Sequence, residues 1–275
     1  MIAVFTDMDG CLLDHHTYEW APARPALLRL GTVGAPVILT TSKTTAEVRH
    51  WQQTLGIHHP SIVENGGAIN LPAGSLNPLP VGSESLESGD SRVVLGWPRA
   101  RVVEALRQAA AECGCEVRGF SGMADGEIAR HCGMSVEQAR LAANREFSEP
   151  FLLPNPDSEP ALRRALEARG LNMTRGGRFH HAQRHPGKGH AVELLLDHYA
   201  RHCPPLVSIG LGDGLNDEGF LRVVHHAVIL KSSQSAELKS RLPHALVTDE
   251  PGPAAWSAAV LELLDMIAPP PAAAG

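Results

Sequence analysis

Short apolar runs alternate with amphipathic stretches near both ends of the chain. The apolar runs have the composition of strands buried on both faces, and they lie at residues 2–5, 36–40, 61–63, 206–211, 227–230 and 245–247. The amphipathic stretches show the helical spacing of apolar residues, and they lie at residues 24–30, 45–55, 187–201, 218–223 and 254–267. This alternation predicts an α/β fold built on a doubly wound, Rossmann-type parallel sheet.

The middle of the chain has a different rhythm. Residues 68–71 look extended, and residues 72–91 are dominated by proline, glycine, serine and glutamate, which is typical of a linker. Beyond it, the pattern predicts strands at 92–97, 116–120, 146–153, 171–174 and 178–182, and helices at 99–112, 135–144 and 156–169. We therefore predict two domains: a core of residues 1–82 and 186–275, and an inserted α+β domain of residues 83–185.

Composition limits the class of protein. Of the 275 residues, 43% are hydrophobic and 20% are charged, and the net charge of −6 gives no reason to expect a nucleic-acid or membrane partner. No apolar run approaches the roughly 20 residues that a membrane helix needs, and the first strand begins without a basic leader. The five cysteines include no CxxC pair, so we expect reduced thiols and a cytoplasmic protein, as a monomer or homodimer.

The most informative stretch follows the first predicted strand and reads Asp7-Met8-Asp9-Gly10. Residues i and i+2 of a strand face the same side, so the two carboxylates start out aimed at one small volume. Gly10 lets the backbone turn sharply and pass close to a ligand. Taken alone, this triplet also suits an ordinary turn or a calcium loop, so its meaning depends on the rest of the chain.

Further polar clusters stand at the ends of other predicted core strands: Thr41-Ser42, Glu64-Asn65-Gly66-Gly67, and Asp213 through Asp217. Doubly wound sheets bind ligands at the C-terminal ends of their strands, so the carboxylates at these ends would converge if the strands are neighbours. Two unit charges about 4 Å apart repel by about 4 kcal/mol at an effective dielectric constant of ~20, so such a group needs a cation. Carboxylate oxygens without paired histidines or thiolates favour Mg²⁺ over zinc.

The remaining polar groups suggest that the ligand is a phosphate. Thr41 or Ser42 offers a hydroxyl donor at a strand end. Lys188 stands at the start of a predicted helix, where the helix dipole disfavours a basic residue. Its position is explained if it faces an anion or the acidic cluster; the alternative is a solvent-exposed lysine.

In their order and spacing, these motifs resemble those of the haloacid dehalogenase (HAD) superfamily of phosphatases. The resemblance implies a HAD-like core with an inserted cap that covers the site and supplies specificity. Asp7 would be the nucleophile that forms an aspartyl-phosphate, and Asp9 the general acid and base. Thr41 would hold a phosphoryl oxygen, and Lys188 would neutralise the nucleophile and the phosphate. The implied Mg²⁺ ligands are Asp7, Asp9, Asp213 and Asp217, with Asn216 in the phosphate shell.

Several local strings narrow the resemblance to the mannosyl-3-phosphoglycerate phosphatases. They are spread along the whole chain, at residues 41–44 (TSKT), 62–67 (IVENGG), 145–149 (REFSE), 176–180 (GGRFH) and 250–253 (EPGP). The resemblance implies a phosphoric monoester hydrolase of mannosylglycerate biosynthesis, which converts mannosyl-3-phosphoglycerate to mannosylglycerate and phosphate.

Such a substrate carries a phosphate, a carboxylate and a hexose. Arginine suits the carboxylate through its bidentate geometry, and Arg145 and Arg178 are candidates, although each also suits a surface salt bridge. Gly177 offers a backbone N–H to an oxyanion, or only makes a hairpin turn. The full set of candidate substrate-binding residues is Ser42, Lys43, Glu64, Asn65, Gly66, Arg145, Gly177, Arg178 and Asn216.

Cys11 departs from the family pattern, which commonly has threonine at this position. A thiol is a weaker hydrogen-bonding group than a hydroxyl, so the support of the loop near Asp9 would differ. Because Asp7 and Asp9 are intact, we expect activity to survive, with Cys11 not acting as a nucleophile.

Other functions stay open at this stage. The same chemistry would serve glucosyl-3-phosphoglycerate or another sugar phosphate, or transfer the phosphoryl group to a sugar hydroxyl in a phosphomutase. A non-catalytic Mg²⁺-binding phosphoacceptor domain also uses an acidic pocket, although Asp9 and the large insert argue against it.

Overall fold

The structure is a computed structural model that describes residues 1–176 and 179–269. Internal packing divides the chain into two compact units. Unit 1 contains Met1–Thr40 and Lys188–Gly275, and unit 2 contains Thr41–Gly187. The domains predicted from the sequence, 1–82 with 186–275 and 83–185, assign the segment 41–82 differently and stay a prediction.

Unit 1 is built on parallel strands in the order β13-β12-β11-β1-β2. Their bounds are β1 Ile2–Thr6, β2 Val37–Thr40, β11 Val207–Gly212, β12 His226–Ile229 and β13 Leu246–Val247. Nearly every residue of β1, β2, β11 and β12 is buried. Burial on both faces explains why these strands appear in the sequence as continuous apolar runs instead of alternating patterns.

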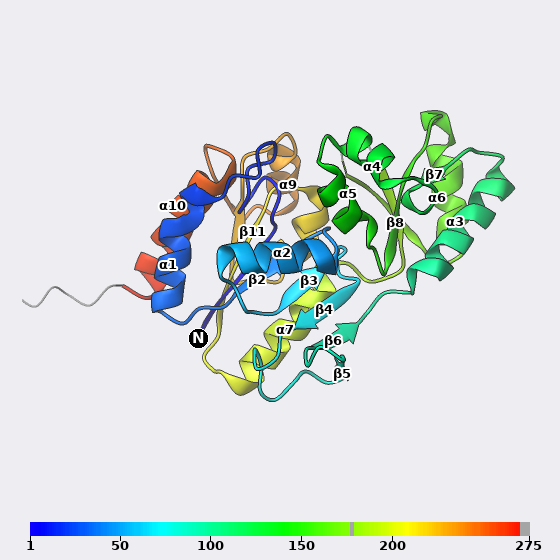
Figure 1. Ribbon diagram of the computed structural model, residues 1–275. Coiled ribbons are helices and arrows are strands. Elements are labelled where there is room, and N and C mark those ends of the chain that lie inside the picture. The colour runs from blue at the N-terminus through cyan, green and yellow to red at the C-terminus, as the bar shows by residue number, and fades with distance from the viewer. Residues whose placement is uncertain (177–178, 270–275) are drawn as a thin grey trace, which may run out of the picture. The chain divides into compact units, whose positions relative to one another are not determined.

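Helices pack around these strands. Their bounds are α1 Arg24–Thr32, α7 Lys188–His202, α8 Glu218–Leu221, α9 Ser235–Arg241 and α10 Gly252–Ile267. Helices α1 and α10 lie side by side (Figure 1). Trp256 of α10 is fully buried, and its Nε1 donates a hydrogen bond of 2.9 Å to the hydroxyl of Thr6 on β1. This contact ties the last helix to the strand that leads into the Asp7 loop.

The strand order reverses next to β1. The chain runs from β1 through α1 to β2 on one side, and later returns through α7 to β11 on the other side. A reversal of this kind opens a crevice at the C-terminal ends of the two central strands. Asp7 follows β1, Asp213 follows β11, and the backbone N–H of Asp7 donates to the carbonyl of Leu211 at 2.9 Å. Segments from opposite ends of the chain therefore meet at this point.

Unit 2 contains two sets of antiparallel strands. The first has the order β3-β4-β6-β5, with β3 Ser61–Val63, β4 Ala68–Leu71, β5 Glu84–Ser85 and β6 Ser91–Val94. The second has the order β7-β8-β10-β9, with β7 Arg118–Gly119, β8 Ser148–Leu152, β9 Asn172–Gly176 and β10 Phe179–Gln183.

The helices of unit 2 are α2 Thr45–Leu55, α3 Arg99–Cys113, α4 Asp125–Cys132, α5 Val136–Ala143 and α6 Glu159–Glu167. Helices α3, α4, α5 and α6 build two small cores on the second set of strands, whereas α2 contacts β3 and α5. Helices α3 and α6 pack on the face that carries Phe151, Met173 and Ala182. Helices α4 and α5 pack around Phe179, whose side chain lies on the other face because successive strand residues alternate.

Most of the predicted elements are confirmed, and the differences have physical causes. The prediction that Ser135 caps a helix is confirmed, since its side chain and that of Gln138 form a reciprocal capping box. Not all strands that follow the first apolar runs are parallel, because β4 runs antiparallel to β3 after a tight turn. The strand predicted at 116–120 is reduced to Arg118–Gly119, the two residues that pair with β8. The predicted linker contains β5, and the short polar helices α4 and α9 were not predicted.

Two further findings concern the cysteines and the lengths of the helices. The five cysteines carry free thiols. No helix within residues 1–176 and 179–269 has both the length and the apolar character required to cross a bilayer.

Candidate active site

The loop after β1 is held in place by backbone contacts. Gly10 has a φ of +75°, and a Cβ at this position would lie 2.7 Å from Oδ2 of Asp213. Only glycine therefore allows the loop to turn here and approach the β11 end so closely. The carbonyl of Gly10 accepts from the N–H of Gly252 at 3.2 Å, and the hydroxyl of Thr6 donates to the carbonyl of Asp7 at 2.7 Å.

Asp217 shapes the loop after β11. Its side chain is fully buried, and Oδ2 accepts the backbone N–H groups of Asp213 and Gly214, each at 3.0 Å. The hydroxyl of Ser232 donates to the carbonyl of Asp213 at 2.7 Å. These bonds fix the backbone from which the Asp213 carboxylate projects.

Lys188 links the two loops. It is the first residue of α7 and only 2% exposed. Its Nζ donates to Oδ1 of Asp7 at 2.9 Å and to Oδ1 of Asp217 at 2.6 Å. The alternative of a solvent-exposed lysine is therefore wrong, and the two carboxylates explain why a cation begins this helix.

Negative charge outweighs positive charge in this part of unit 1. Burial raises the pKa of Asp7 to about 7, with Asp217 and Asp9 adding to the shift while Lys188 opposes it. Burial likewise raises the pKa of Asp213 to about 8, together with repulsion from Asp7 and Asp217. Burial alone would lower the pKa of Lys188, but the carboxylates of Asp217 and Asp7 outweigh it and hold the pKa above its usual range. One ammonium group does not neutralise these acids.

This charge pattern fits a divalent cation. Asp7, Cys11 and Asp213 offer ligand atoms that all lie within 4.8 Å of one another. The two carboxylates of this cluster are the hard oxygen ligands that Mg²⁺ prefers. Asp9 is near enough to raise the pKa of both Asp7 and Asp213. Both oxygens of Asp217 accept hydrogen bonds, Oδ1 from Lys188 and Oδ2 from the β11 loop, and its assignment as a Mg²⁺ ligand stays a prediction.

The candidates in unit 2 gather around the turn after β3. Glu64 and Asn65 have φ values of +48° and +59°, a conformation that costs free energy in non-glycine residues. The backbone N–H of Glu64 donates to the carbonyl of Lys43, and that of Asn65 to the carbonyl of Thr41, each at 2.9 Å. The Thr41 hydroxyl in turn accepts the N–H of Lys43 at 3.2 Å. The strained turn and the Thr41–Lys43 loop therefore support each other, and Gly66 completes the turn.

Glu64 is fully buried and bonded to the segment before β8. Its carboxylate accepts the N–H groups of Glu146 at 2.7 Å and Phe147 at 3.1 Å, and the hydroxyl of Ser148 at 2.5 Å. Arg145 approaches the same carboxylate at 3.5 Å and donates from Nη2 to the carbonyl of Ser42 at 2.7 Å. Ser42, Glu64 and Arg145 thus meet within unit 2, where their contacts are internal. Their assignment to the substrate stays a prediction.

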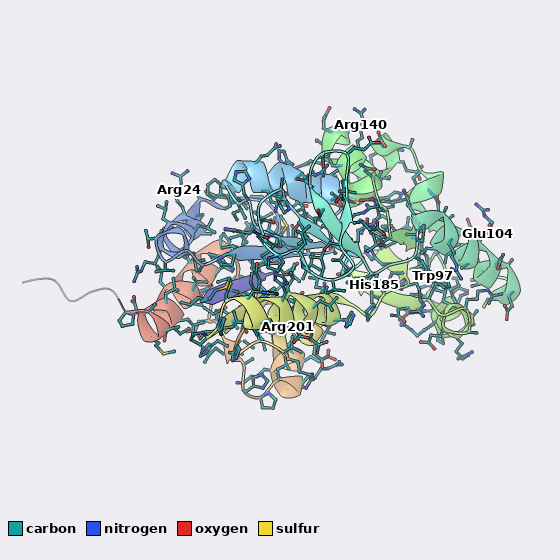
Figure 2. The ribbon with its side chains drawn as sticks, turned by 90° about the horizontal axis from the view of Figure 1, so that it is seen from below. Arg24, Trp97, Glu104, Arg140, His185 and Arg201 are labelled. Atoms are coloured by element: carbon teal, nitrogen blue, oxygen red, sulfur yellow. The ribbon has the colours of Figure 1, made fainter. Side chains whose placement is uncertain are left out.

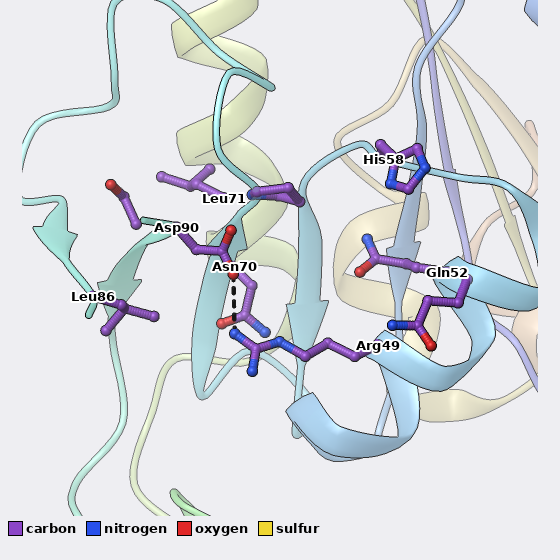
Figure 3. Close-up of a pocket in the computed structure, with 10 residues that line it drawn as sticks. Arg49, Gln52, His58, Asn70, Leu71, Leu86 and Asp90 are labelled. Carbon is purple, nitrogen blue, oxygen red and sulfur yellow. Dashed lines mark hydrogen bonds and ion pairs between the residues drawn. The ribbon is translucent and has the colours of Figure 1, made fainter. Parts of the chain in front are cut away.

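The structure gives less information on the remaining predicted site residues. Asn216 is exposed in the short 3-10 turn Leu215–Asp217. Gly177 and Arg178 lie outside the described residues. A cavity of about 210 Å³ beside α2 is lined by none of the predicted site residues (Figure 3). An ion pair of 3.0 Å between Arg49 and Asp90 spans it, so its charged groups already have partners.

Several residues that support the site carry no clear signal in the sequence. Ser232 and Thr6 act through single hydroxyl groups. Ser232 donates to Asp213 in another loop, whereas Thr6 donates to its neighbour Asp7 and accepts from Trp256 near the end of the chain. Gly252 is the exception, because it lies in the string EPGP at 250–253, one of the strings that carry the resemblance to the mannosyl-3-phosphoglycerate phosphatases. Cys11 was noted as a departure from that family, but its place among the candidate ligands depends on the fold.

Comparison with known proteins places the chain in a family. Residues 4–77 match the haloacid dehalogenase-like hydrolase family. The glucosyl-3-phosphoglycerate/mannosyl-3-phosphoglycerate phosphatase of Methanococcoides burtonii is 33% identical over 267 residues, which cover 95% of this chain and 96% of the relative. The protein of the same name from Persephonella marina is 30% identical over 268 residues, covering 97% of this chain and 98% of the relative.

Solved structures agree on the fold. A sugar phosphatase of HAD subclass IIB superimposes with a TM-score of 0.66 at 15% identity, covering 96% of this chain and 99% of that chain. On the strength of the family match and the two full-length relatives, the chain belongs to the haloacid dehalogenase-like hydrolases and, within them, to the glucosyl-3-phosphoglycerate/mannosyl-3-phosphoglycerate phosphatases, which are phosphoric monoester hydrolases.

Proposed function

We propose that this protein is a Mg²⁺-dependent phosphatase that hydrolyses mannosyl-3-phosphoglycerate to mannosylglycerate and phosphate. The observation that carries the proposal is the Lys188 bridge between Asp7 and Asp217, next to Asp213. In this arrangement a buried carboxylate can act as the nucleophile, the ammonium group of Lys188 lies beside it, and the surrounding acidic residues need a metal cation to balance their charge. The names of the two full-length relatives support the substrate class.

Asp7 acts as the nucleophile. A carboxylate oxygen of Asp7 bonds to phosphorus while the bond from phosphorus to the glycerate oxygen breaks. The ammonium group of Lys188, 2.9 Å from Oδ1 of Asp7, favours the ionised carboxylate and opposes the upward pKa shift caused by burial. Asp7 and Asp213 would hold Mg²⁺, which, when bound, screens the charge of the phosphoryl group.

Asp9 acts as the general acid and then as the general base. It protonates the departing glycerate oxygen in the first step, then takes a proton from the water that attacks the aspartyl-phosphate. In that second step the bond between Asp7 and phosphorus breaks, so phosphate leaves and the Asp7 carboxylate is restored. Thr41 holds a phosphoryl oxygen in this scheme, and Lys43, Asn65, Asn216 and Arg178 contact the rest of the substrate.

Glucosyl-3-phosphoglycerate is the second candidate substrate. Both relatives carry the glucosyl and the mannosyl compound in their names. The two sugars differ only in the orientation of one hydroxyl group, so a site that recognises the shared phosphoglycerate would accept either one. A monomer or homodimer in the cytoplasm, acting on this small substrate without a nucleic-acid or membrane partner, remains part of the proposal.

A phosphate-release screen with Mg²⁺ tests the substrate assignment. The panel should contain both glycosyl-3-phosphoglycerates, 3-phosphoglycerate, mannose 6-phosphate and an aryl phosphate. We expect the glycosyl-3-phosphoglycerates to give the highest kcat/KM. Arg178→Ala should raise KM for them far more than for the aryl phosphate, which has no carboxylate. Preference for a plain sugar phosphate would point instead to a different sugar phosphatase.

A further inference from the structure

Arg145 reaches from the segment before β8 to the loop that carries Thr41. Its side chain is 5% exposed, and Nη2 donates to the backbone carbonyl of Ser42 at 2.7 Å. The two partners are 103 residues apart in the sequence, so no local pattern reveals the contact. A hydrogen bond from a charged donor is roughly twice as strong as one between neutral groups. The guanidinium group of Arg145 therefore holds the Ser42 carbonyl firmly in place.

Two further contacts fix the guanidinium group itself. Nε donates to the hydroxyl of Ser148 at 2.9 Å and lies 3.5 Å from the carboxylate of Glu64. Glu64 is fully buried and also accepts the Ser148 hydroxyl at 2.5 Å. The charge of Arg145 is thus balanced, and its Nε and Nη2 already donate within unit 2. This arrangement suits a fixed structural contact rather than a clamp for a substrate carboxylate, which needs a free pair of N–H groups.

One peptide group connects Arg145 to the hydroxyl of Thr41. The carbonyl of Ser42 and the N–H of Lys43 belong to the same planar peptide. The carbonyl accepts from Arg145, and the N–H donates to Oγ1 of Thr41 at 3.2 Å. Successive hydrogen bonds polarise one another, so the positive charge strengthens the bond that the N–H donates. The Thr41 hydroxyl uses one lone pair for that bond, and its own hydrogen turns away from Lys43.

The backbone of Thr41 is fixed on both sides. Its N–H donates to the carbonyl of Ile62, and its carbonyl accepts the N–H of Asn65, each at 2.9 Å. The residue is 1% exposed, so the surrounding protein also restricts the side chain. The direction of the hydroxyl hydrogen is then the main remaining freedom, and the peptide that Arg145 holds sets this direction.

We propose that Arg145 is a positioning residue for phosphoryl transfer, which orients the Thr41 hydroxyl as a donor to a phosphoryl oxygen through the Ser42–Lys43 peptide. The inference rests on the role that the proposed function gives to Thr41. It replaces a contact of Arg145 with the substrate carboxylate by an action on the phosphoryl group, which every substrate shares. Loss of Arg145 should therefore slow the hydrolysis of all phosphate monoesters alike.

Kinetics with two substrates separate the two roles. Phosphate release with Mg²⁺ is measured for mannosyl-3-phosphoglycerate and for an aryl phosphate, which has neither carboxylate nor hexose. Arg145→Met should lower kcat for both by about 100-fold, because a small misplacement of a group that contacts the reacting atoms costs about this much. KM should change little, as expected when an interaction made in the transition state is lost. Arg140→Met is the matched control and should leave both rates unchanged, because Arg140 of α5 pairs with Asp125 at the surface (Figure 2).

A double-mutant cycle with Thr41→Val tests whether Arg145 acts through Thr41. In the Thr41→Val background, Arg145→Met should cause less than about a twofold further loss of kcat. An effect of Arg145 on folding alone would appear in full in both backgrounds. Amide hydrogen exchange adds a readout that needs no turnover: exchange at Lys43 should become faster in Arg145→Met, while the amides of β1 keep their rates.

The inference is overturned if Arg145→Met raises only KM for mannosyl-3-phosphoglycerate, if its full effect persists in Thr41→Val, or if exchange at Lys43 is unaltered. The exchange criterion is independent of activity, so it decides the inference even for a chain that releases no phosphate. Such an inactive chain contradicts the proposed function alone. A chain that hydrolyses only the aryl phosphate contradicts the proposed substrate, and its kcat in Arg145→Met still supports or overturns the inference.

Discussion

Lys188 has hydrogen bonds to Asp7 and Asp217 and almost no contact with solvent. A buried ion pair adds little net stability, but removal of one partner leaves the other as an uncompensated buried charge. Lys188→Met should therefore lower the free energy of unfolding by about 3–5 kcal/mol, measured by urea denaturation. Arg107→Ala is the matched control, because Arg107 pairs with Glu104 on the exposed face of α3. That change should cost less than about 1 kcal/mol; equal losses would mean that Lys188 is not the centre of a buried pair.

Substitution of Asp7 should affect catalysis but not stability. Asp7→Asn removes one of several crowded carboxylates while preserving the size of the side chain. We expect phosphate release to fall on the order of 10⁴-fold, because an amide is a poor nucleophile. The melting temperature should stay unchanged or rise, since burial and like charges already oppose ionisation of Asp7. Near-normal turnover in this variant would rule out an aspartyl-phosphate on Asp7.

At the scale of elements, Glu64 joins the turn after β3 to the start of β8. Its carboxylate accepts two backbone N–H groups and one hydroxyl from residues 146–148. Glu64→Gln keeps the shape but removes the charge and replaces one acceptor by a donor. We expect a loss of about 2–3 kcal/mol in unfolding free energy and faster hydrogen exchange in β8. Glu104→Gln, an exposed change on α3 (Figure 2), should alter neither. Unchanged exchange in β8 would contradict the bridging role of Glu64.

Local signals explain which elements could be predicted. Helix α2 was predicted with its observed bounds, because Thr44 and Glu47 form a capping box and Gly56 ends the helix in the left-handed region. Strand β4 looked extended, but its antiparallel direction depends on pairing with β3 and β6, which no local pattern specifies. Helix α9 was missed because only Ser235 and Leu238 on it are buried, too few to show helical periodicity.

At the scale of the whole molecule, the order of the strands determines which of the predicted site residues lie close together. Asp7 and Asp213 were predicted to converge, and the reversal of strand order beside β1 brings them together in unit 1. The hydrogen bonds of Asp217 could not be predicted. A motif shows the spacing of residues, but not which carboxylate oxygen accepts from Lys188 and which accepts from the backbone. The hydroxyl of Ser232 depends on a segment beyond β12 and has no sequence signature.

Stability of the whole chain should depend on pH through His185. The ring is 1% exposed, and burial lowers its pKa to about 4 from a usual value of 6.5 (Figure 2). Between these values the unfolded chain binds a proton that the folded chain excludes, so unfolding becomes easier as pH falls. This effect amounts to about 1.4 kcal/mol per pH unit between pH 6.5 and 4.

His185→Gln should remove that part of the pH dependence, as followed by denaturation at several pH values. His190→Gln is the control, because His190 is exposed at the start of α7. If His185→Gln and the unaltered chain show the same slope, the buried ring does not govern acid stability.

Detection of the covalent intermediate tests the central claim most directly. Excess unaltered protein is mixed with mannosyl-3-phosphoglycerate and Mg²⁺, quenched with acid within the first turnover, and mapped by peptide mass spectrometry. The proposed mechanism predicts one added phosphoryl group on Asp7, absent in Asp7→Asn and absent when 3-phosphoglycerate replaces the substrate. Phosphate released in the first turnover with Asp7 unmodified, or a phosphoryl group on another residue, would contradict it.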